Sequence, residues 1–89
     1  MDIKRSAFSG TLESSDAYIE IEPSEKGLSI DVESVVLKQF GSQIKSAVLS
    51  VLDEFEVKNA NVKVLDRGAL ECVIRARVEC AIFRAKGED

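Results

Sequence analysis

Two segments near the N-terminus alternate apolar with polar residues, which is the period of a strand with one buried face. Residues 17–22 read Ala-Tyr-Ile-Glu-Ile-Glu, and residues 28–33 read Leu-Ser-Ile-Asp-Val-Glu. The connector 23–27 begins with Pro and ends with Gly, two residues that favour turns. We therefore predict an antiparallel hairpin with a five-residue loop.

The apolar period changes after residue 33. Apolar residues then recur three and four positions apart, which predicts an amphipathic helix of about five to six turns. They are Val36, Leu37, Phe40, Ile44, Ala47, Val48, Val51, Leu52 and Phe55. Ser34 precedes them and is a suitable N-cap. We expect this helix to contribute most to the core.

The C-terminal third is harder to assign. Residues 57–65 resemble another strand, and residues 66–68 (Asp-Arg-Gly) a turn. In residues 70–78 apolar side chains alternate with Glu, Val and Arg, although the content of Ala, Leu and Arg also suits a helix. We interpret 70–78 as a strand that passes into a short helix near 79–86.

The first residues carry little pattern. Residues 1–9 alternate poorly, and we predict an arm or weak edge strand anchored by Ile3 and Phe8. The polar segment 10–16 follows as a loop, because no Glu or Gln stands three residues after either of its serines to form a capping box. The predicted fold is α+β, in a single domain of residues 1–89: a small antiparallel sheet of about four to five strands packed on one long amphipathic helix, with a short C-terminal helix.

Charge is distributed unevenly along the chain, whose net charge is −4. The segment 13–33 has one base, Lys26, and seven acids: Glu13, Asp16, Glu20, Glu22, Glu25, Asp31 and Glu33. The segment 67–86 is locally basic, but it has no motif of a nucleic-acid-binding protein. This distribution disfavours nucleic acid as a partner and suits basic proteins.

The residue types limit the chemistry. Cys72 and Cys80 are eight positions apart, about 26 Å on a strand or about 12 Å on a helix, too far for a disulfide within regular structure. We expect both to be small buried residues in a reducing compartment. The chain has no His, which excludes Cys–His and Ser–His catalysis. We find neither a signal peptide nor a membrane-spanning run and expect a cytoplasmic protein without a membrane partner.

The segment Gly-Thr-Leu-Glu-Ser-Ser-Asp at 10–16 is the candidate functional stretch. A serine without an adjacent general base is a poor nucleophile, so we do not expect Ser14 to be catalytic. An exposed hydroxyl on a loop can nevertheless be the substrate of another enzyme. Local physics alone describes the segment as a turn.

This segment, together with Asp-Arg-Gly-Ala-Leu-Glu-Cys at 66–72 and Arg-Ala-Arg at 75–77, resembles the citrate lyase acyl carrier protein (gamma subunit) family. The resemblance implies a non-catalytic subunit with a covalently attached 2'-(5''-phosphoribosyl)-3'-dephospho-coenzyme A on the first serine of the motif, Ser14. It also implies that the arm thiol bears acetyl and citryl groups between the transferase (alpha) and lyase (beta) subunits. Two further partners are implied, the prosthetic-group transferase and the ligase that acetylates the thiol.

Several roles stay open at this point. Ser15 is the rival attachment site, because the chemistry of two adjacent hydroxyls is the same. Glu13 and Asp16 would keep the loop solvated and steer basic partners, since like charge disfavours contact with the arm's phosphates. Arg75 and Arg77 either dock those phosphates or a partner, or form an outward strand face paired with carboxylates such as those of Glu20 and Glu22.

The alternative function is a small α+β interaction or regulatory domain that carries no covalent group and binds through its acidic face. An independent enzyme is the weakest hypothesis, because the chain has neither His nor a paired buried carboxylate motif.

Overall fold

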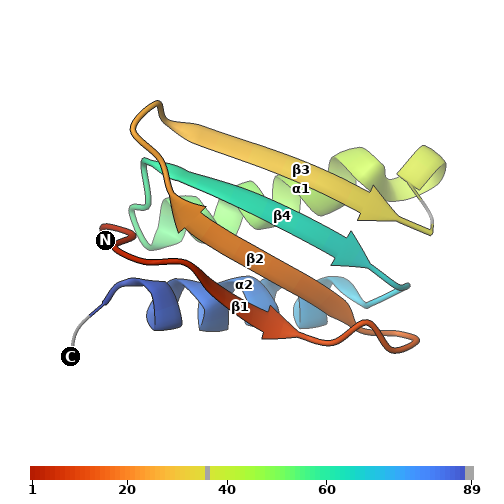
Figure 1. Cartoon of the computed structure of the whole chain (residues 1–89). Coiled ribbons are helices and arrows are strands. Elements are labelled where there is room, and N and C mark those ends of the chain that lie inside the picture. Colours follow the sequence, from red (N-terminus) through yellow and green to blue (C-terminus); the bar gives the residue numbers. More distant parts are fainter. Residues whose placement is uncertain (36, 88–89) are drawn as a thin grey trace.

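The computed structural model of the protein describes residues 1–35 and 37–87. The elements in chain order are β1 (Ala7–Gly10), β2 (Ala17–Pro23), β3 (Leu28–Ser34), α1 (Leu37–Glu54), β4 (Ala60–Asp66) and α2 (Glu71–Ala85) (Figure 1). The predicted α+β class is confirmed, and the four strands lie within the predicted number.

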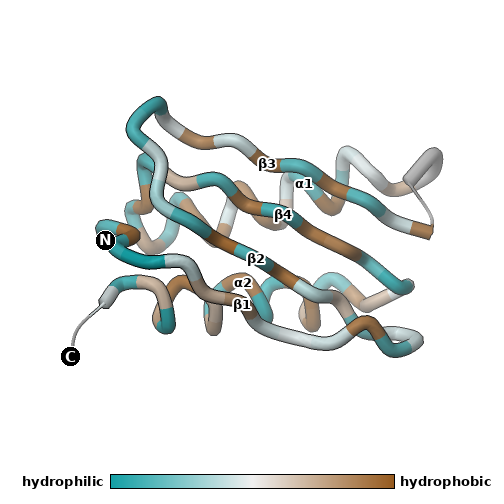
Figure 2. The backbone as a smooth tube through the Cα atoms, in the orientation of Figure 1, coloured by the Kyte–Doolittle hydropathy of each residue, from teal (hydrophilic) through white to brown (hydrophobic). Residues whose placement is uncertain are grey.

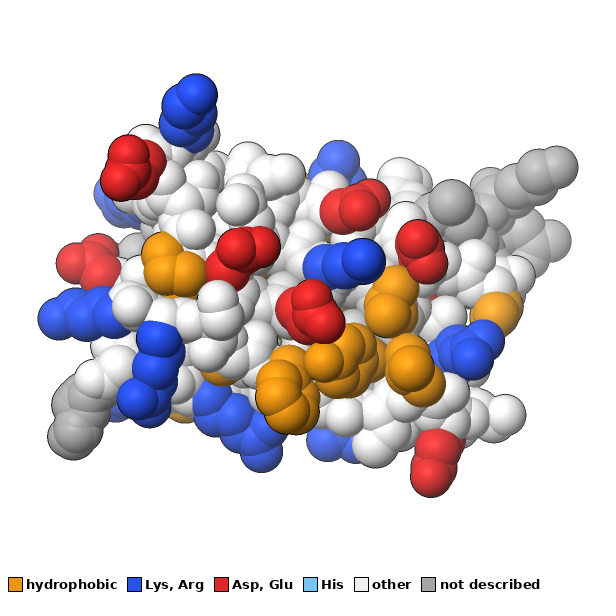
Figure 3. Space-filling model, in the orientation of Figure 1, with side chains coloured by type: hydrophobic (Ala, Val, Ile, Leu, Met, Phe, Trp, Pro, Cys, Tyr) orange, Lys and Arg blue, Asp and Glu red, His pale blue; other side chains and the backbone are white. Residues whose placement is uncertain are grey.

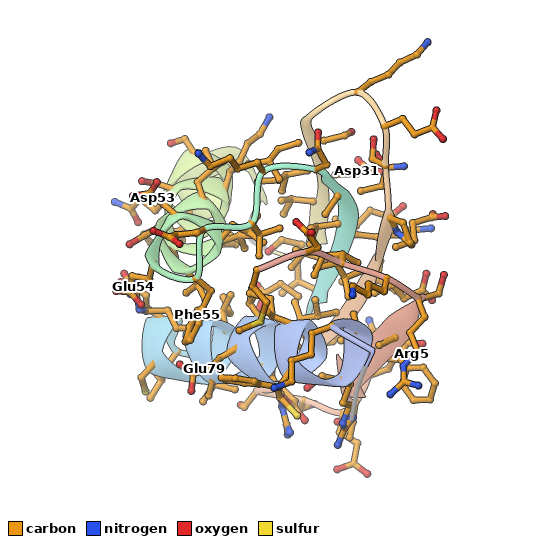
Figure 4. All side chains as sticks on the ribbon, turned by 90° about the vertical axis from the view of Figure 1, so that its left-hand side faces the viewer. Arg5, Asp31, Asp53, Glu54, Phe55 and Glu79 are labelled. Atoms are coloured by element: carbon orange, nitrogen blue, oxygen red, sulfur yellow. The ribbon has the colours of Figure 1, made fainter. Side chains whose placement is uncertain are left out.

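The molecule has two layers, with both helices on the same face of the sheet. Figure 4, turned by 90° from Figure 1, shows the helices on one side and the strands on the other. The apolar residues of the core lie between the layers. From the sheet they include Ala17, Ile19, Ile21, Val62 and Val64, and from α1 they include Ile44, Val48, Val51 and Leu52.

The sheet has the order β1-β2-β4-β3 and is mixed rather than entirely antiparallel. β2 pairs antiparallel with both β1 and β4, whereas β3 pairs parallel with β4. The predicted hairpin between residues 17–22 and 28–33 is therefore wrong: β2 and β3 run in opposite directions, but β4 lies between them.

The connector between β2 and β3 explains how a third strand fits there. Four residues, 24–27, cross about 10 Å, which is two strand spacings. The connector is also bound to the start of β4, because Ala60 N–H donates to the Gly27 carbonyl (3.1 Å) and Gly27 N–H donates to Asn59 Oδ1 (3.0 Å). The central position suits β4, whose Val62 and Val64 are buried, whereas the apolar side chains of β3 are only half-buried or exposed.

The alternation predicted for the strands is confirmed. Along β2 the residues at 17, 19 and 21 are buried and those at 18 and 20 lie on the other face, and β4 has the same pattern. Figure 2 shows the alternating hydropathy along the strands. β4 begins at Ala60, later than the predicted strand 57–65. At the N-terminus Ile3 is buried as predicted, but Phe8 is exposed although it was predicted to anchor the chain.

The long amphipathic helix is confirmed as α1. Val36, which the pattern placed on its apolar face, lies outside the described residues. Ser34 is the last residue of β3, and its Oγ donates to Asp66 Oδ2 (2.7 Å) on the neighbouring strand. Its predicted role as an N-cap depends on residue 36, which lies outside the described residues.

The strand predicted at 70–78 is wrong, because this segment is the start of helix α2. The buried residues of α2 are spaced three and four apart: Ile74, Val78, Ala81, Ile82 and Ala85. Leu70 is 71% exposed, and Cys72 and Ala76 are exposed, so three of the five apolar positions assigned to a strand face lie in solvent. The prediction of two buried cysteines is likewise wrong for Cys72.

Candidate functional site

The loop 11–16 joins β1 to β2 at one end of the sheet, and Gly10 determines the backbone conformation with which the chain enters this loop. Gly10 has φ +93°, and a Cβ at this position would lie 1.9 Å from the Ala17 carbonyl oxygen. Only glycine can therefore turn the chain this close to the start of β2. The predicted loop is confirmed, and it is held to a tight path.

Asp16 closes this loop from within. Its carboxylate accepts hydrogen bonds from Thr11 Oγ1 (2.6 Å) and from the Ala17 N–H (2.7 Å). Arg77, on α2, donates to both carboxylate oxygens, from Nε at 3.0 Å and from Nη2 at 2.9 Å. Two parallel bonds of this kind fix the orientation as well as the distance of the pair.

These contacts change the electrostatics of Asp16. The hydrogen bonds from Arg77, followed by those from Thr11 and Ala17, hold the pKa of Asp16 well below its usual range, and they outweigh the opposing effect of burial. The Asp16 side chain is only 15% exposed. The prediction that Asp16 keeps the loop solvated is therefore wrong, because its carboxylate is bound inside the protein. Glu13 remains exposed as expected.

The loop is also bound to the turn at 66–68. Ser15 N–H donates to the Arg67 carbonyl (2.8 Å), and Arg67 N–H donates to the Asp16 carbonyl (2.9 Å). The Arg67 side chain reaches back, with Nε donating to the Leu12 carbonyl (3.2 Å). These hydrogen bonds hold two segments that are far apart in the sequence side by side at one end of the sheet (Figure 1).

Asp66 stabilises the turn at 66–68 from the buried side of the sheet. It is 2% exposed, and its carboxylate accepts hydrogen bonds from Ser34 Oγ (2.7 Å) and from the Ala69 N–H (2.9 Å). From the sequence we expected no role for Asp66 beyond the turn. A signal was available: the period of two that buries Val62 and Val64 also places residue 66 on the buried face. Thr11 was missed too, and only the loop geometry reveals its bond to Asp16.

The two serines are the central residues of a β-turn. Asp16 N–H donates to the Glu13 carbonyl (3.2 Å), so Ser14 and Ser15 occupy the tip. Ser15 has φ +66°, a left-handed conformation that is uncommon for residues other than glycine. Both serines are exposed, and within the described residues no hydrogen bond involves Ser14 Oγ. The Ser15 backbone is tied to Arg67, whereas the Ser14 hydroxyl is available to solvent.

The two arginines of the predicted docking pair do not share a face. On a helix, residues two apart point about 200° apart. Arg77 binds Asp16 in the loop, whereas Arg75 Nη2 lies 3.0 Å from Glu54 Oε2 at the end of α1. The predicted pairing of both arginines with Glu20 and Glu22 is therefore wrong. Arg77 is a structural partner of the serine loop, and Arg75 connects the two helices.

The arrangement offers a reachable hydroxyl on a firmly held turn. Ser14 has no His in the chain to act as a general base. Among residues 1–35 and 37–87, no group of three or more His, Cys, Asp or Glu side chains is placed to hold a metal ion. No helix within this part of the chain has the length and apolar character needed to cross a membrane.

Comparison with known proteins places this geometry in a family. Residues 4–85 match the family model described as acyl carrier protein, malonate decarboxylase delta subunit. The citrate lyase acyl carrier protein of Treponema denticola is 58% identical over 85 residues, covering 96% of this chain and 97% of the relative. The protein of the same name from Latilactobacillus sakei is 45% identical over 89 residues, covering 100% of this chain and 88% of the relative.

The fold also recurs in a solved structure. A chain of a Pseudomonas malonate decarboxylase hetero-tetramer, crystallised in complex with malonate, superimposes with a TM-score of 0.78 over 96% of this chain and 92% of that chain, at 23% identity. At this identity the match shows the shared fold. The relatives, which are twice as similar in sequence and match over nearly the whole chain, show more: the chain belongs to the citrate lyase acyl carrier protein family, a family of non-catalytic carrier subunits.

Proposed function

We propose that the chain is the acyl carrier subunit of a citrate lyase and that Ser14 holds its prosthetic group, 2'-(5''-phosphoribosyl)-3'-dephospho-coenzyme A. The observation that carries the assignment to Ser14 is its position at the tip of a β-turn with an exposed hydroxyl. The names of relatives 45–58% identical support citrate, rather than malonate, as the source of the acyl group.

The residues around Ser14 fit such an attachment. When the link forms, Ser14 Oγ displaces the leaving group of an activated phosphoryl donor, and the hydroxyl proton passes to a base of the modifying enzyme. An exposed Oγ without an internal partner has no hydrogen bond to give up. Asp16 and Arg77 neutralise each other, so they place little net charge beside the group's phosphates. When attached, the group supplies a thiol that carries acetyl or citryl as a thioester.

The chain's own contribution is to hold the attachment point. Arg67 binds the carbonyls of Leu12 and Asp16, one before and one after the turn, and Arg77 binds the Asp16 side chain, so the backbone that carries Ser14 is held while the attached group moves freely. A tethered thioester meets each partner's active site by a local search, which replaces capture from solution. The proposed partners are the transferase (alpha) and lyase (beta) subunits, the enzyme that attaches the group and the ligase that acetylates its thiol.

A matched pair of serine variants tests the attachment site. Ser14→Ala and Ser15→Ala are each expressed in place of the native chain in citrate-fermenting cells of the source organism. Ser14→Ala is expected to abolish citrate lyase activity, because no oxygen remains to hold the group. Ser15→Ala is expected to retain most of it. Lyase activity that survives Ser14→Ala and disappears with Ser15→Ala would move the site to Ser15.

The alternative function, an interaction domain without a covalent group, makes a different prediction. Both variants would then leave the activity unchanged, and the chain isolated from these cells would have its unmodified mass. Chain produced without the modifying enzyme is expected to be bare under either hypothesis.

A further inference from the structure

No element among residues 1–35 and 37–87 covers one face of the sheet. Both helices pack against the face that carries Ile19, Ile21, Val62 and Val64. The opposite face, which we call the open face, consists of the alternate side chains of all four strands. Figure 3 looks directly onto it.

The open face has an apolar patch at the end near the serine loop, formed by Phe8, Tyr18, Leu65 and Leu12. Phe8 is 59% exposed, and its ring centroid lies 5.8 Å from that of Tyr18. Tyr18 stands opposite Leu65 on β4 and opposite Gly10 on β1, where no side chain covers the ring. Leu12 and Leu65 line one hollow beside the loop. Hydrophobic side chains gather in this area in Figure 3.

Acidic side chains border the patch along β2 and β3. β2 contributes Glu20 and Glu22, and β3 contributes Asp31 and Glu33, all of them exposed. The single base in these rows is Lys63, which stands in register between Glu20 and Asp31. Burial, and secondarily the Glu20 carboxylate, raises the pKa of Tyr18, so its phenol stays neutral beside these acids.

Two arginines of α2 are paired with carboxylates, Arg77 with Asp16 and Arg75 with Glu54. Arg84 Nη1 donates to the neutral Phe8 carbonyl (2.8 Å), and Arg67 lines the hollow with Leu12 and Leu65, so these two arginines keep their positive charge at the edge of the patch. On the strands themselves, four carboxylates against one ammonium still give the open face a net negative charge beside an apolar centre. A surface of this kind is complementary to a protein surface with apolar side chains inside a rim of Lys and Arg.

The patch and the serine turn are continuous. Gly10 ends β1 opposite Tyr18 and begins the loop, and Leu12 lies two residues before Ser14. A protein seated on the open face therefore lies beside the turn that presents Ser14. Three strands of seven residues and one of four span at most about 19 by 23 Å. An area of this size suits a contact that forms and releases.

We propose that the open face is the docking surface for a basic-rimmed subunit that acts on the acyl group at Ser14. The proposal rests on the carrier function proposed above and adds the surface by which the carrier is recognised. The occupant is a different protein: a second copy of this chain would bring two acidic faces together.

Charge reversal at two sites tests the proposal. Glu22→Lys with Glu33→Lys changes the open face at positions that do not stand opposite Lys63. The matched control, Asp53→Lys with Glu79→Lys, makes the same change at exposed positions on the helical side (Figure 4). Affinity for the purified alpha and beta citrate lyase subunits is measured by titration calorimetry at two salt concentrations. We expect the open-face variant to bind at least one of them about tenfold or more weakly and with less salt dependence, and the control to stay within about twofold.

A second pair tests the apolar centre. Phe8→Thr removes an exposed aromatic ring and keeps a residue that favours strands, and Leu49→Gln removes an exposed apolar side chain from α1. Phe8→Thr is expected to weaken binding about tenfold and Leu49→Gln less than twofold. The thermal midpoint of every variant is measured, and only folded variants are compared.

The outcomes separate the two proposals. The docking proposal would be overturned if the open-face variants bound the alpha and beta subunits as tightly as their matched controls. It would also be overturned if the native chain formed a dimer that Phe8→Thr dissociates. The carrier function is tested independently by the intact mass of the chain from citrate-fermenting cells, which shows whether Ser14 carries an adduct. An unmodified Ser14 together with selective loss of subunit binding in the open-face variants would retain the surface and refute the carrier.

Discussion

Asp16 is the residue on which the serine turn depends. It accepts hydrogen bonds from the side chains of Thr11 and Arg77 and from the Ala17 backbone, and it is mostly buried. The sequence identified the loop and its serines, because Gly, Ser and Asp gather where chains turn. It did not reveal the bond to Arg77, because that bond joins residues 61 positions apart and depends on α2 being a helix.

Neutralising Asp16 is therefore expected to destabilise the fold. Asp16→Asn keeps the shape of the side chain but loses the charged hydrogen bonds, and we expect the free energy of unfolding to fall by about 1–2 kcal/mol at pH 7. Glu54→Gln, which breaks the more exposed pair with Arg75, is expected to cost less than about 0.5 kcal/mol. Urea denaturation measures both, and equal effects would contradict the special position of Asp16.

The depressed pKa of Asp16 predicts a pH dependence with a definite sign. In the unfolded chain an Asp titrates near about 3.9, and the bonds from Arg77 hold the folded-state pKa of Asp16 below this value. Stability from the ionised form is therefore complete above about pH 5 and is lost as the pH falls below about 4. The difference in thermal midpoint between the native chain and Asp16→Asn should be constant from pH 7 to 5 and shrink toward pH 3. A difference in thermal midpoint that grows toward pH 3 would contradict a lowered pKa of Asp16 in the folded state.

Gly10 makes a separate residue-scale prediction. Ala at this position would require φ +93° and would place its Cβ on the Ala17 carbonyl, so we expect a loss of at least about 2 kcal/mol. Gly27 is the matched control, because it has φ +91° but nothing within 4 Å of the added Cβ. Gly27→Ala is expected to cost only about 1 kcal/mol, and urea denaturation compares the two. Similar losses at both sites would show that the close approach at Gly10 is unimportant.

At the scale of elements, strong local patterns were predictable and pairings were not. The alternation of β2 and β3 and the helical period of α1 are properties of consecutive residues, and each predicted the correct element. The partner of a strand is decided by segments far along the chain. β4 displaced the expected β2–β3 pairing because it brings the more deeply buried valines to the centre of the sheet.

The error at α2 has a different physical origin. Residues four apart share a face in both a strand and a helix, so Ile74 and Val78 fit either period. The positions that distinguish the two periods lie beyond the predicted strand, at Ala81 and Ile82, which are buried side by side. Within 70–78 the alternation over five positions favours a strand, although the composition of the segment favours a helix.

A substitution in the middle of α2 distinguishes the two assignments. Ala76 is exposed, so packing contributes little at this site. Val is less favourable than Ala in a helix by roughly 0.6 kcal/mol and more favourable in a strand. Ala76→Val is therefore expected to lower the free energy of unfolding by about 0.5 kcal/mol in urea denaturation. An increase would contradict the helix.

The whole molecule divides its tasks between its parts. The helices and one face of the sheet form the core. The hydrogen-bonded segments 11–16 and 66–68 hold the serine turn, and the open face is not covered by any of the described residues. The chemistry of the proposed acyl transfers then belongs to partner subunits, in agreement with a carrier that has no His in its sequence. The lack of His predicted that the chain has no Ser–His or Cys–His catalysis of its own, and the family resemblance implied the partners, but the position of the open face beside Ser14 required the fold.

The central claim is that Ser14 is the covalent attachment site, and mass spectrometry of the native chain tests it most directly. The chain is isolated from citrate-fermenting cells with active lyase, and its intact mass and fragment spectra are recorded. We predict one discrete adduct with the mass of the phosphoribosyl dephospho-coenzyme A group, localised by fragmentation to Ser14. Unmodified chain from such cells, or an adduct on Ser15, would contradict the claim.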